Sequence, residues 1–323
     1  MKNTASKPKQ EMDLIALMNN FGSDDKCRQY LELLRFPNGV YCLRCESTKI
    51  SRIYKRNQFV CDACTYQFSV TVGTIFHDSH LPLQKWFCAI YLMCESRKGI
   101  SANQLKRTLK VAYKTAWYLC HRIRKAVENA NDTLLTGIIE ADETFIGGKA
   151  KNMHQSVKEQ KIQGRGAVGK AIVLGAKMRG GDVRLTTAKD TTRKTLHAFI
   201  KSEVSPNATC IMTDEFPAYN GIGDADTRHE KVNHSQGEYV RYDANGDVHT
   251  NGVENVWSLF KRSIVGAYHQ ISEKHLDRYL DEMEFRFNNR NNPYIFRDTI
   301  LRLIASENLE YKELTSDKST KDQ

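Results

Sequence analysis

The sequence predicts a mixed α/β (α+β) protein of several domains, and three observations support this prediction. The chain has 323 residues, which is more than one average domain uses. Between residues 136 and 305, short β-type runs separated by glycines are followed by helical stretches, an order typical of α/β or α+β domains. Two Cys-x-x-Cys pairs precede that region and indicate a small metal-binding module.

Composition and charge indicate a folded protein with a polyanionic partner. Apolar residues make up 40% of the chain, enough for real cores. The 48 Lys and Arg exceed the 38 Asp and Glu, which gives a net charge of +10 and favours nucleic acid as the partner. The polar N-terminus is unlike a signal peptide, and no run approaches the ~18 apolar residues of a membrane span. We therefore expect a cytoplasmic protein with no membrane partner, in a compartment where disulfides are rare.

Changes of pattern along the chain divide it into five predicted segments. The first is helical, the second contains the cysteine pairs, the third is helical and basic, the fourth is catalytic, and the fifth is a polar tail expected to be disordered. Their predicted ranges are 1–36, 37–75, 76–132, 133–306 and 307–323.

The cysteine pairs predict a structural zinc site. Cys42 and Cys45 form one pair, and Cys61 and Cys64 form the second after a gap of fifteen residues. This spacing is typical of a tetrahedral four-thiolate site for one Zn²⁺, with no open position for catalysis. The intervening run offers a strand that can pair with the run containing Phe68, Val70 and Val72, as in a zinc ribbon. A pair of redox Cys-x-x-Cys motifs is the alternative, but thioredoxin-like context is lacking.

A basic helical segment predicts contact with DNA. Between residues 97 and 125 there are nine Lys or Arg and no Asp or Glu. Two short helices joined by a tight turn, the second rich in basic residues, resemble a helix-turn-helix. A solvated basic face on a helical hairpin is the alternative. The candidate DNA-contact residues here are Lys106, Arg107, Lys114, Arg122 and Arg124.

Three acids at the ends of predicted elements are the candidate catalytic residues. Asp142 and Asp214 each end an apolar β-type run, where a carboxylate is costly unless it is paired or binds a metal. Glu254 begins a predicted helix, and Lys261 follows two turns later on the same face, within reach of a phosphate.

The three acids together suit a pair of Mg²⁺ or Mn²⁺ ions. Hard oxygen ligands are the ones that Mg²⁺ prefers, and two ions can stabilise the attacking and the leaving oxygen of a phosphodiester. Each acid alone could be a strand-end cap, a turn residue or a helix-surface charge. Glu140, Glu143 and Glu215 are neighbouring alternatives.

Blocks of sequence resemble those of the insertion-sequence DDE transposases that carry an N-terminal zinc ribbon, a bacterial group related to Merlin elements. The resemblance covers roughly residues 25–290. The blocks are RFPNGVYCLRC, FSVTVGTIFHDSHLPLQKW, EADETFIGGK, GRGAVGKAIVLGA, TDEFPAY and HTNGVENVWSLFKRSIVGAYH. It implies a ribonuclease-H-like catalytic domain with Asp142, Asp214 and Glu254 as metal ligands and Lys261 as the helix lysine.

The resemblance also implies the reaction and its partners. The enzyme would bind the terminal inverted repeats of an insertion sequence, cut with water, and join the new 3′-hydroxyls to target DNA. It would work as a homodimer or higher oligomer, at the nucleoid if bacterial. A domesticated DNA-binding protein that no longer transposes, and a nuclease of the same fold, are the alternatives.

One further segment and two further residues have less specific predictions. The glycine-containing segment 149–170, with Lys149, Lys151 and Arg165 as candidate DNA contacts, is either a loop that embraces DNA or an ordinary surface loop. His249 is a weaker candidate for a phosphate contact, and Trp257 is expected in the core.

Overall fold

The computed structural model describes residues 12–128, 133–147, 169–223, 227–244 and 246–316. The chain forms two compact units, each described here by itself. The first contains residues 1–128 and 291–323, and the second contains residues 129–290. In the described residues, every helix is too short or too polar to cross a membrane.

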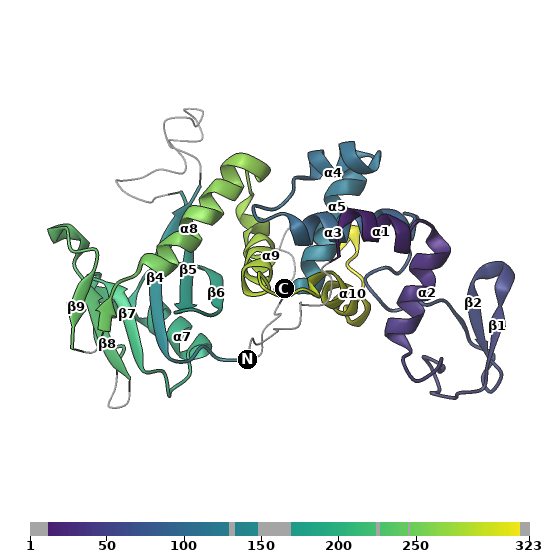
Figure 1. Cartoon of the computed structure of the whole chain (residues 1–323), viewed down its shortest axis with the longest axis horizontal. Helices are drawn as coiled ribbons and strands as arrows, with labels where there is room; N and C mark the ends of the chain where they lie inside the picture. Colours follow the sequence, from purple (N-terminus) through teal and green to yellow (C-terminus); the bar gives the residue numbers. More distant parts are fainter. Residues whose placement is uncertain (1–11, 129–132, 148–168, 224–226, 245, 317–323) are drawn as a thin grey trace, which may run out of the picture. The chain divides into compact units, whose positions relative to one another are not determined.

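The first unit is mainly helical, as predicted for its sequence (Figure 1). Its core is formed by apolar side chains of all of its longer helices, among them Leu31, Phe87 and Ile123. Side-chain caps start several helices: Ser23 accepts from the amide of Lys26, and Ser101 accepts from that of Gln104. The helices are α1 (Leu14–Asn20), α2 (Asp24–Arg35), α3 (Leu83–Glu95), α4 (Ala102–Leu109), α5 (Tyr113–Val127), α10 (Ile295–Ala305) and α11 (Tyr311–Thr315).

The cysteine-containing segment forms a small antiparallel sheet with the order β1-β2-β3. The strands are β1 (Ile50–Ile53), β2 (Gln58–Cys61) and β3 (Gln67–Phe68). The predicted pairing with Phe68 is present, since Phe59 lies opposite it. The prediction was wrong for Val70 and Val72, which lie in turns after the strand. The intervening run also forms two strands instead of one, because Asn57 adopts a left-handed conformation that turns the chain.

The C-terminal region differs from the prediction at two points. Helix α10 packs in the core of the first unit through Phe296, Ile300 and Leu303, so the second unit ends at residue 290 and not at 306. The prediction of a disordered segment after residue 306 was also wrong for residues 307–316, which include helix α11. Leu309 and Leu314 are buried in the same core, which gives this short segment the apolar contacts that order it.

Replacement of the buried tail leucine tests this packing. We expect Leu314→Ala to destabilise the first unit by about 2–5 kcal/mol, because the change leaves a cavity in a packed core. Leu33→Ala is the control, since Leu33 of α2 is 65% exposed. Differential scanning calorimetry should show a clearly lower Tm for the first variant only; equal Tm values would contradict the packing.

The second unit is built on a five-stranded mixed sheet with the order β6-β5-β4-β7-β8. Strands β4, β5 and β6 pair antiparallel, whereas β7 and β8 continue parallel to β4. A two-stranded hairpin, β9 (Arg241–Asp243) and β10 (Gly246–Val248), precedes the next helix. The sheet strands are β4 (Ile138–Ile146), β5 (Ala171–Met178), β6 (Val183–Ala188), β7 (Cys210–Asp214) and β8 (Arg228–Val232).

Helices cover both faces of this sheet. On one face α7 (Arg193–Glu203) packs against alternate residues of β4, including Ile139 and Ala141. On the other face lie α8 (Asn251–Ser263) and α9 (Leu276–Asn288), whose apolar residues pack with those of β5 and β6. This mixed sheet agrees with the predicted α/β class and the ribonuclease-H-like fold.

Candidate active site and metal centre

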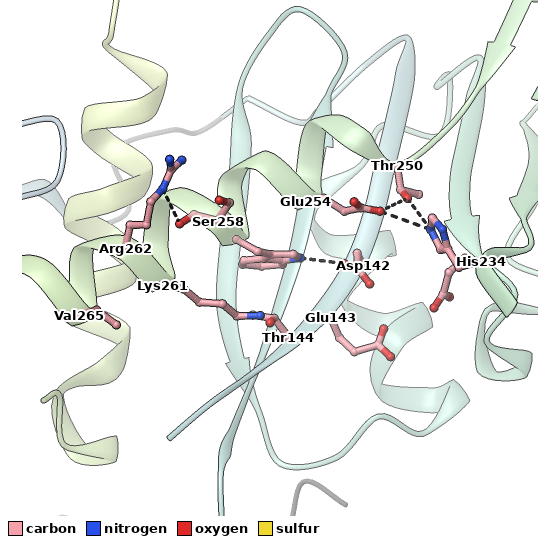
Figure 2. A pocket seen from close by; sticks show the side chains of 12 residues that line it. Asp142, Glu143, Thr144, His234, Thr250, Glu254, Ser258, Lys261, Arg262 and Val265 are labelled. Atoms are coloured by element: carbon pink, nitrogen blue, oxygen red, sulfur yellow. Dashed lines mark hydrogen bonds and ion pairs between the residues drawn. The ribbon is translucent and has the colours of Figure 1, made fainter. Parts of the chain in front are cut away.

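The two aspartates lie where two parallel strands stop pairing. Strands β4 and β7 are paired up to Glu140 and Met212, two residues before Asp142 and Asp214. If this pairing register is extended by two residues, Asp142 lies opposite Asp214. Both side chains line a cavity of about 660 Å³ that lies against β4, β7 and α8. Figure 2 shows Asp142 at this cavity.

Helix α8 brings the third acid and the lysine to this cavity. Val253, Val256 and Phe260 are buried against the sheet, which leaves the opposite helix face exposed. Glu254 and Lys261 both lie on the exposed face and line the cavity, as their spacing of two turns predicts. The predicted residues Asp142, Asp214, Glu254 and Lys261 therefore lie around one cavity.

The aspartates are in an environment that favours a cation. Burial and the nearby Glu143 and Asp214 carboxylates raise the pKa of Asp142 to about 7. Burial also raises the pKa of Asp214. Negative charges that are this close and this poorly solvated are stabilised by a divalent cation, so the donor set and its electrostatics fit a hard metal ion.

Glu254 has its own partners in this structure. Its Oε1 accepts a hydrogen bond of 3.1 Å from the Thr250 hydroxyl and lies 3.3 Å from His234 Nε2 (Figure 2). His234 was not predicted as a site residue. It lies in a short turn after β8, and only the folded structure shows that this turn lies beside α8.

Asp142 is oriented by Trp257, which the sequence predicted only as a core residue. Trp257 is indeed buried, and its Nε1–H donates a 2.9 Å hydrogen bond to Asp142 Oδ2. Its ring lies over Gly175 of β5, where an added Cβ would come within 2.5 Å of it. Any larger residue at position 175 would displace the ring.

If Asp142 holds a metal in strand cleavage, as the sequence predicts, Trp257→Phe should slow that reaction by about 10–100-fold, because loss of a hydrogen bond that orients a metal ligand has effects of this size. Single-turnover cleavage of labelled DNA measures the effect. Trp117→Phe, in α5 of the first unit, is the matched control. An unchanged rate for Trp257→Phe would contradict the orienting role.

Glu143 and Glu215, two of the alternative acids, have different surroundings. Glu143 also lines the cavity, but its Oε2 accepts a 2.8 Å hydrogen bond from the Tyr219 hydroxyl. Glu215 accepts from the backbone amides of His234 and Ser235 and lies outside the cavity lining. Glu215 therefore lies away from the cavity, whereas Glu143 lines it beside Asp142 and Asp214.

The four cysteines form a compact cluster. All four Sγ atoms lie within 4.8 Å of one another, and Cys42–Cys64 and Cys45–Cys61 are each separated by 3.6 Å. A tetrahedron with Zn–S bonds of about 2.3 Å has sulfur–sulfur edges of about 3.8 Å, so the cluster fits Zn²⁺. Among the described residues, no other three His, Cys, Asp or Glu side chains have ligand atoms that all lie within 4.8 Å of one another. The carboxylate oxygens of Asp142, Asp214 and Glu254 are therefore further apart than the four sulfur atoms.

The predicted DNA-contact residues separate into three groups. Lys106, Arg107 and Lys114 are exposed on α4 and α5. The predictions for Arg122 and Arg124 were wrong, because both side chains are buried.

Arg122 instead supports the core of the first unit. Its Nη2 donates to the carbonyls of Ile75 and His77 and to Asn308 Oδ1, so the guanidinium is bonded inside the protein. The other three candidates, Lys149, Lys151 and Arg165, lie outside the described residues.

Comparisons with known proteins identify two domains and two relatives of the chain. Residues 134–288 match the ISXO2-like transposase domain, and residues 22–67 match the transposase zinc-ribbon domain. A protein of transposable element ISH50 from Halobacterium salinarum is 31% identical over 283 residues, which cover 83% of this chain and 92% of that protein. A transposase-like protein of Haemophilus influenzae is 32% identical over 95 residues, 29% of this chain and 72% of that protein.

Among solved structures, a chain of a simian T-cell lymphotropic virus intasome in complex with PP2A regulatory subunit B56 gamma gives a TM-score of 0.21 at 15% identity, over 68% of this chain and 72% of that chain. A likeness this weak supports no conclusion. The two domain matches and the 31% identity to nearly the whole ISH50 protein support a firm one. The chain belongs to the IS1595 family of transposases.

Proposed function

We propose that the protein binds the terminal inverted repeats of an insertion sequence, hydrolyses the DNA strands there, and joins the resulting 3′-hydroxyls to target DNA. The observation that carries the proposal is the meeting of Asp142, Asp214 and Glu254 around one cavity, with Lys261 on its rim. Membership of a transposase family supports DNA as the substrate.

Asp142, Asp214 and Glu254 would hold Mg²⁺ or Mn²⁺, as two ions. The bound metal would supply activation of the attacking oxygen and stabilisation of the leaving oxygen. The chain contributes position and charge: the sheet places the aspartates, Trp257 orients Asp142, and α8 presents Glu254. Lys261 would pair with a phosphate oxygen of the DNA, since its exposed side chain borders the same cavity.

The zinc ribbon and the basic helices would bind the DNA ends. Lys106, Arg107 and Lys114 are the exposed candidates for phosphate contacts, and Lys149, Lys151 and Arg165 remain candidates outside the described residues. Cleavage at two ends of one element requires synapsis, for which we propose a homodimer or higher oligomer. Because the substrate is genomic DNA, we expect the protein at the nucleoid of a bacterial cell.

The double variant Lys106→Ala, Arg107→Ala tests the proposed phosphate contacts. Each lost contact is expected to reduce the slope of log affinity against log salt concentration by about 0.9, because fewer counterions are released on binding. Fluorescence anisotropy with labelled duplex DNA at several salt concentrations measures the slope. Lys189→Ala, an exposed lysine of the second unit, is the control and should leave it unchanged. Equal slopes in all three proteins would contradict the assignment.

One reconstituted reaction tests the proposed activity. Purified protein, Mg²⁺, a labelled duplex ending in the inverted repeats that flank the gene, and a target plasmid should yield plasmid with covalently joined label. Cleavage without joining would indicate a nuclease of the same fold. Binding without either reaction would indicate a domesticated DNA-binding protein, and both results would contradict the proposal.

A further inference from the structure

Glu140 is a buried carboxylate that the proposed reaction does not use. It lies two residues before Asp142 on β4, so both side chains face α8. Only 1% of Glu140 is exposed. Removing a carboxylate from water in this way costs several kcal/mol unless it is paired and hydrogen-bonded. Its partners therefore indicate what it does.

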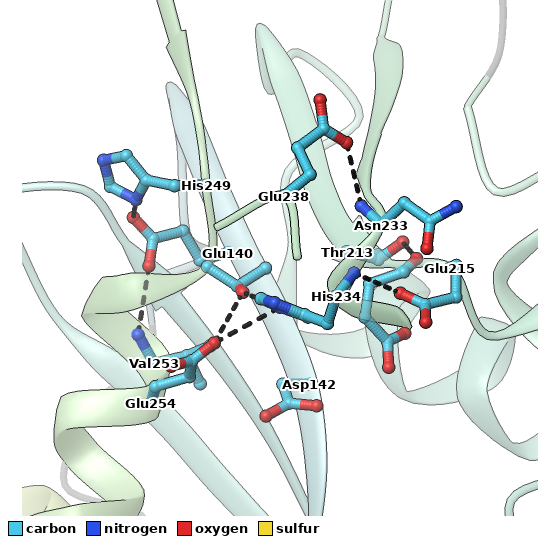
Figure 3. A network of polar contacts seen from close by, with 12 residues as sticks. Glu140, Asp142, Thr213, Glu215, Asn233, His234, Glu238, His249, Val253 and Glu254 are labelled. Atoms are coloured by element: carbon cyan, nitrogen blue, oxygen red, sulfur yellow. Dashed lines mark hydrogen bonds and ion pairs between the residues drawn. The ribbon is translucent and has the colours of Figure 1, made fainter. Parts of the chain in front are cut away.

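One oxygen of Glu140 is bonded to the start of α8. Its Oε2 accepts a 3.0 Å hydrogen bond from the backbone amide of Val253 (Figure 3). The helix comes so close that a Cβ added at Gly252 would lie 2.5 Å from Oε2. Thr250, the residue before the helix, makes no side-chain cap of its own. Glu140 thus caps α8 from another element, where the positive end of the helix dipole favours a carboxylate.

The other oxygen accepts a hydrogen bond from one basic side chain and lies near a second. Arg179 Nε donates to Glu140 Oε1 at 3.1 Å. His249 Nδ1 lies 3.4 Å from the same atom (Figure 3). Arg179 also donates to the backbone carbonyls of Asp247 and His249, the segment that leads into α8. Sheet, connecting segment and helix start are therefore tied together at one carboxylate.

We infer that Glu140 is a positioning residue for the active site, acting through α8. Glu140 is two residues from Asp142 on the strand, and its partner Val253 is next to Glu254 on the helix. Fixing the helix start to β4 fixes where the Glu254 side chain begins relative to Asp142. This inference rests on the proposed function, because positioning matters only if Asp142 and Glu254 share a metal site.

The variants Glu140→Ala and Gly252→Ala break the anchor from its two sides. The first removes the acceptor, and the second keeps it but forces the helix and the carboxylate apart. Alanine is a better helix former than glycine, so any loss in Gly252→Ala cannot arise from weaker helix propensity. Glu140→Gln retains an acceptor for the Val253 amide. Gly266→Ala is the matched control, because a Cβ at Gly266 meets nothing within 4 Å.

Two measurements on the full, zinc-loaded chain test the inference. Hydrogen exchange followed by mass spectrometry should show faster exchange of peptides covering residues 251–256 in Glu140→Ala and Gly252→Ala. Calorimetric titration with Mn²⁺ should show an affinity weaker by about 10–100-fold in both, the usual effect of losing support behind a metal ligand. Glu140→Gln should lie between these variants and the wild type, and Gly266→Ala should match the wild type.

Each other outcome contradicts a different claim. Unchanged exchange in Glu140→Ala and Gly252→Ala would overturn the anchor itself. Faster exchange with unchanged Mn²⁺ affinity would overturn the positioning role while leaving the proposed function intact. Mn²⁺ binding by the wild type should be lost in Asp142→Asn. If the wild type binds no Mn²⁺, or if Asp142→Asn binds it equally well, the proposed metal site is wrong. The positioning role is then wrong too, even if hydrogen exchange changes in Glu140→Ala. Should Glu140→Ala fail to fold, Gly252→Ala carries both measurements.

Discussion

Asp142→Asn, Asp214→Asn and Glu254→Gln are each expected to slow strand cleavage by about 10³-fold or more, while DNA binding and the fold persist. Each change removes a negative charge from the cavity but keeps nearly the same side-chain volume. The rate should therefore collapse because metal can no longer be held where charge develops during the reaction. Single-turnover cleavage in Mg²⁺ measures the rate, and anisotropy measures binding.

Asp243→Asn is the matched control for these three variants. Asp243 is an exposed aspartate at the end of β9, outside the cavity lining. Its cleavage rate should equal that of the wild type within about 2-fold, as for a surface change away from the site. Cleavage that survives in any of the three cavity variants would show that the side chain concerned is not a ligand.

Loss of zinc is expected to have the largest effect on the first unit. Cys42 and Cys61 are fully buried, and they lie in the two different pairs of the cluster. Structural zinc sites of this kind contribute about 10–16 kcal/mol of apparent binding free energy at neutral pH, which is also folding free energy. Cys42→Ser or Cys61→Ser should therefore reduce the zinc content from one ion per chain to none and unfold the β1-β2-β3 sheet.

Metal analysis and circular dichroism of the purified variants measure both effects. Cys88→Ser is the control, because Cys88 lies in α3 outside the cluster. A strong chelator applied to the wild type should reproduce the effect of the two cluster variants. Full zinc content in Cys61→Ser would contradict the four-cysteine site.

The sequence could predict residues whose chemistry depends on local pattern. The prediction that each aspartate ends an apolar strand was right for Asp214, the last residue of β7, and wrong for Asp142, which lies in the middle of β4. The buried apolar runs still indicated both residues, because the register of the parallel pair β4 and β7 sets them at one level. Helical spacing placed Glu254 and Lys261 on one face, and cysteine spacing identified the zinc site. Each of these predictions requires only the backbone period or the length of one turn.

Other features depend on packing between distant parts of the chain and could not be predicted. Arg122 has the composition of a DNA-contact residue, yet its helix face turns inward and meets carbonyls near residue 75. Leu314 lies in a polar tail, and the apolar residues that it packs against belong to distant helices of the first unit. Glu140 and Asp142 share one face of β4, and they differ in their contacts: Glu140 bonds the start of α8, whereas Asp142 lines the cavity.

The most direct test of the central claim is a switch of metal preference at position 142. A cysteine thiolate is a soft ligand that accepts Mn²⁺ better than Mg²⁺. We expect Asp142→Cys to be inactive in cleavage with Mg²⁺, and its cleavage rate with Mn²⁺ to be at least about 10-fold higher than with Mg²⁺. Asp142→Ala should be inactive with both metals. Cleavage by Asp142→Cys with Mg²⁺ at the wild-type rate, or cleavage by Asp142→Ala with either metal, would contradict the assignment of Asp142 as a metal ligand.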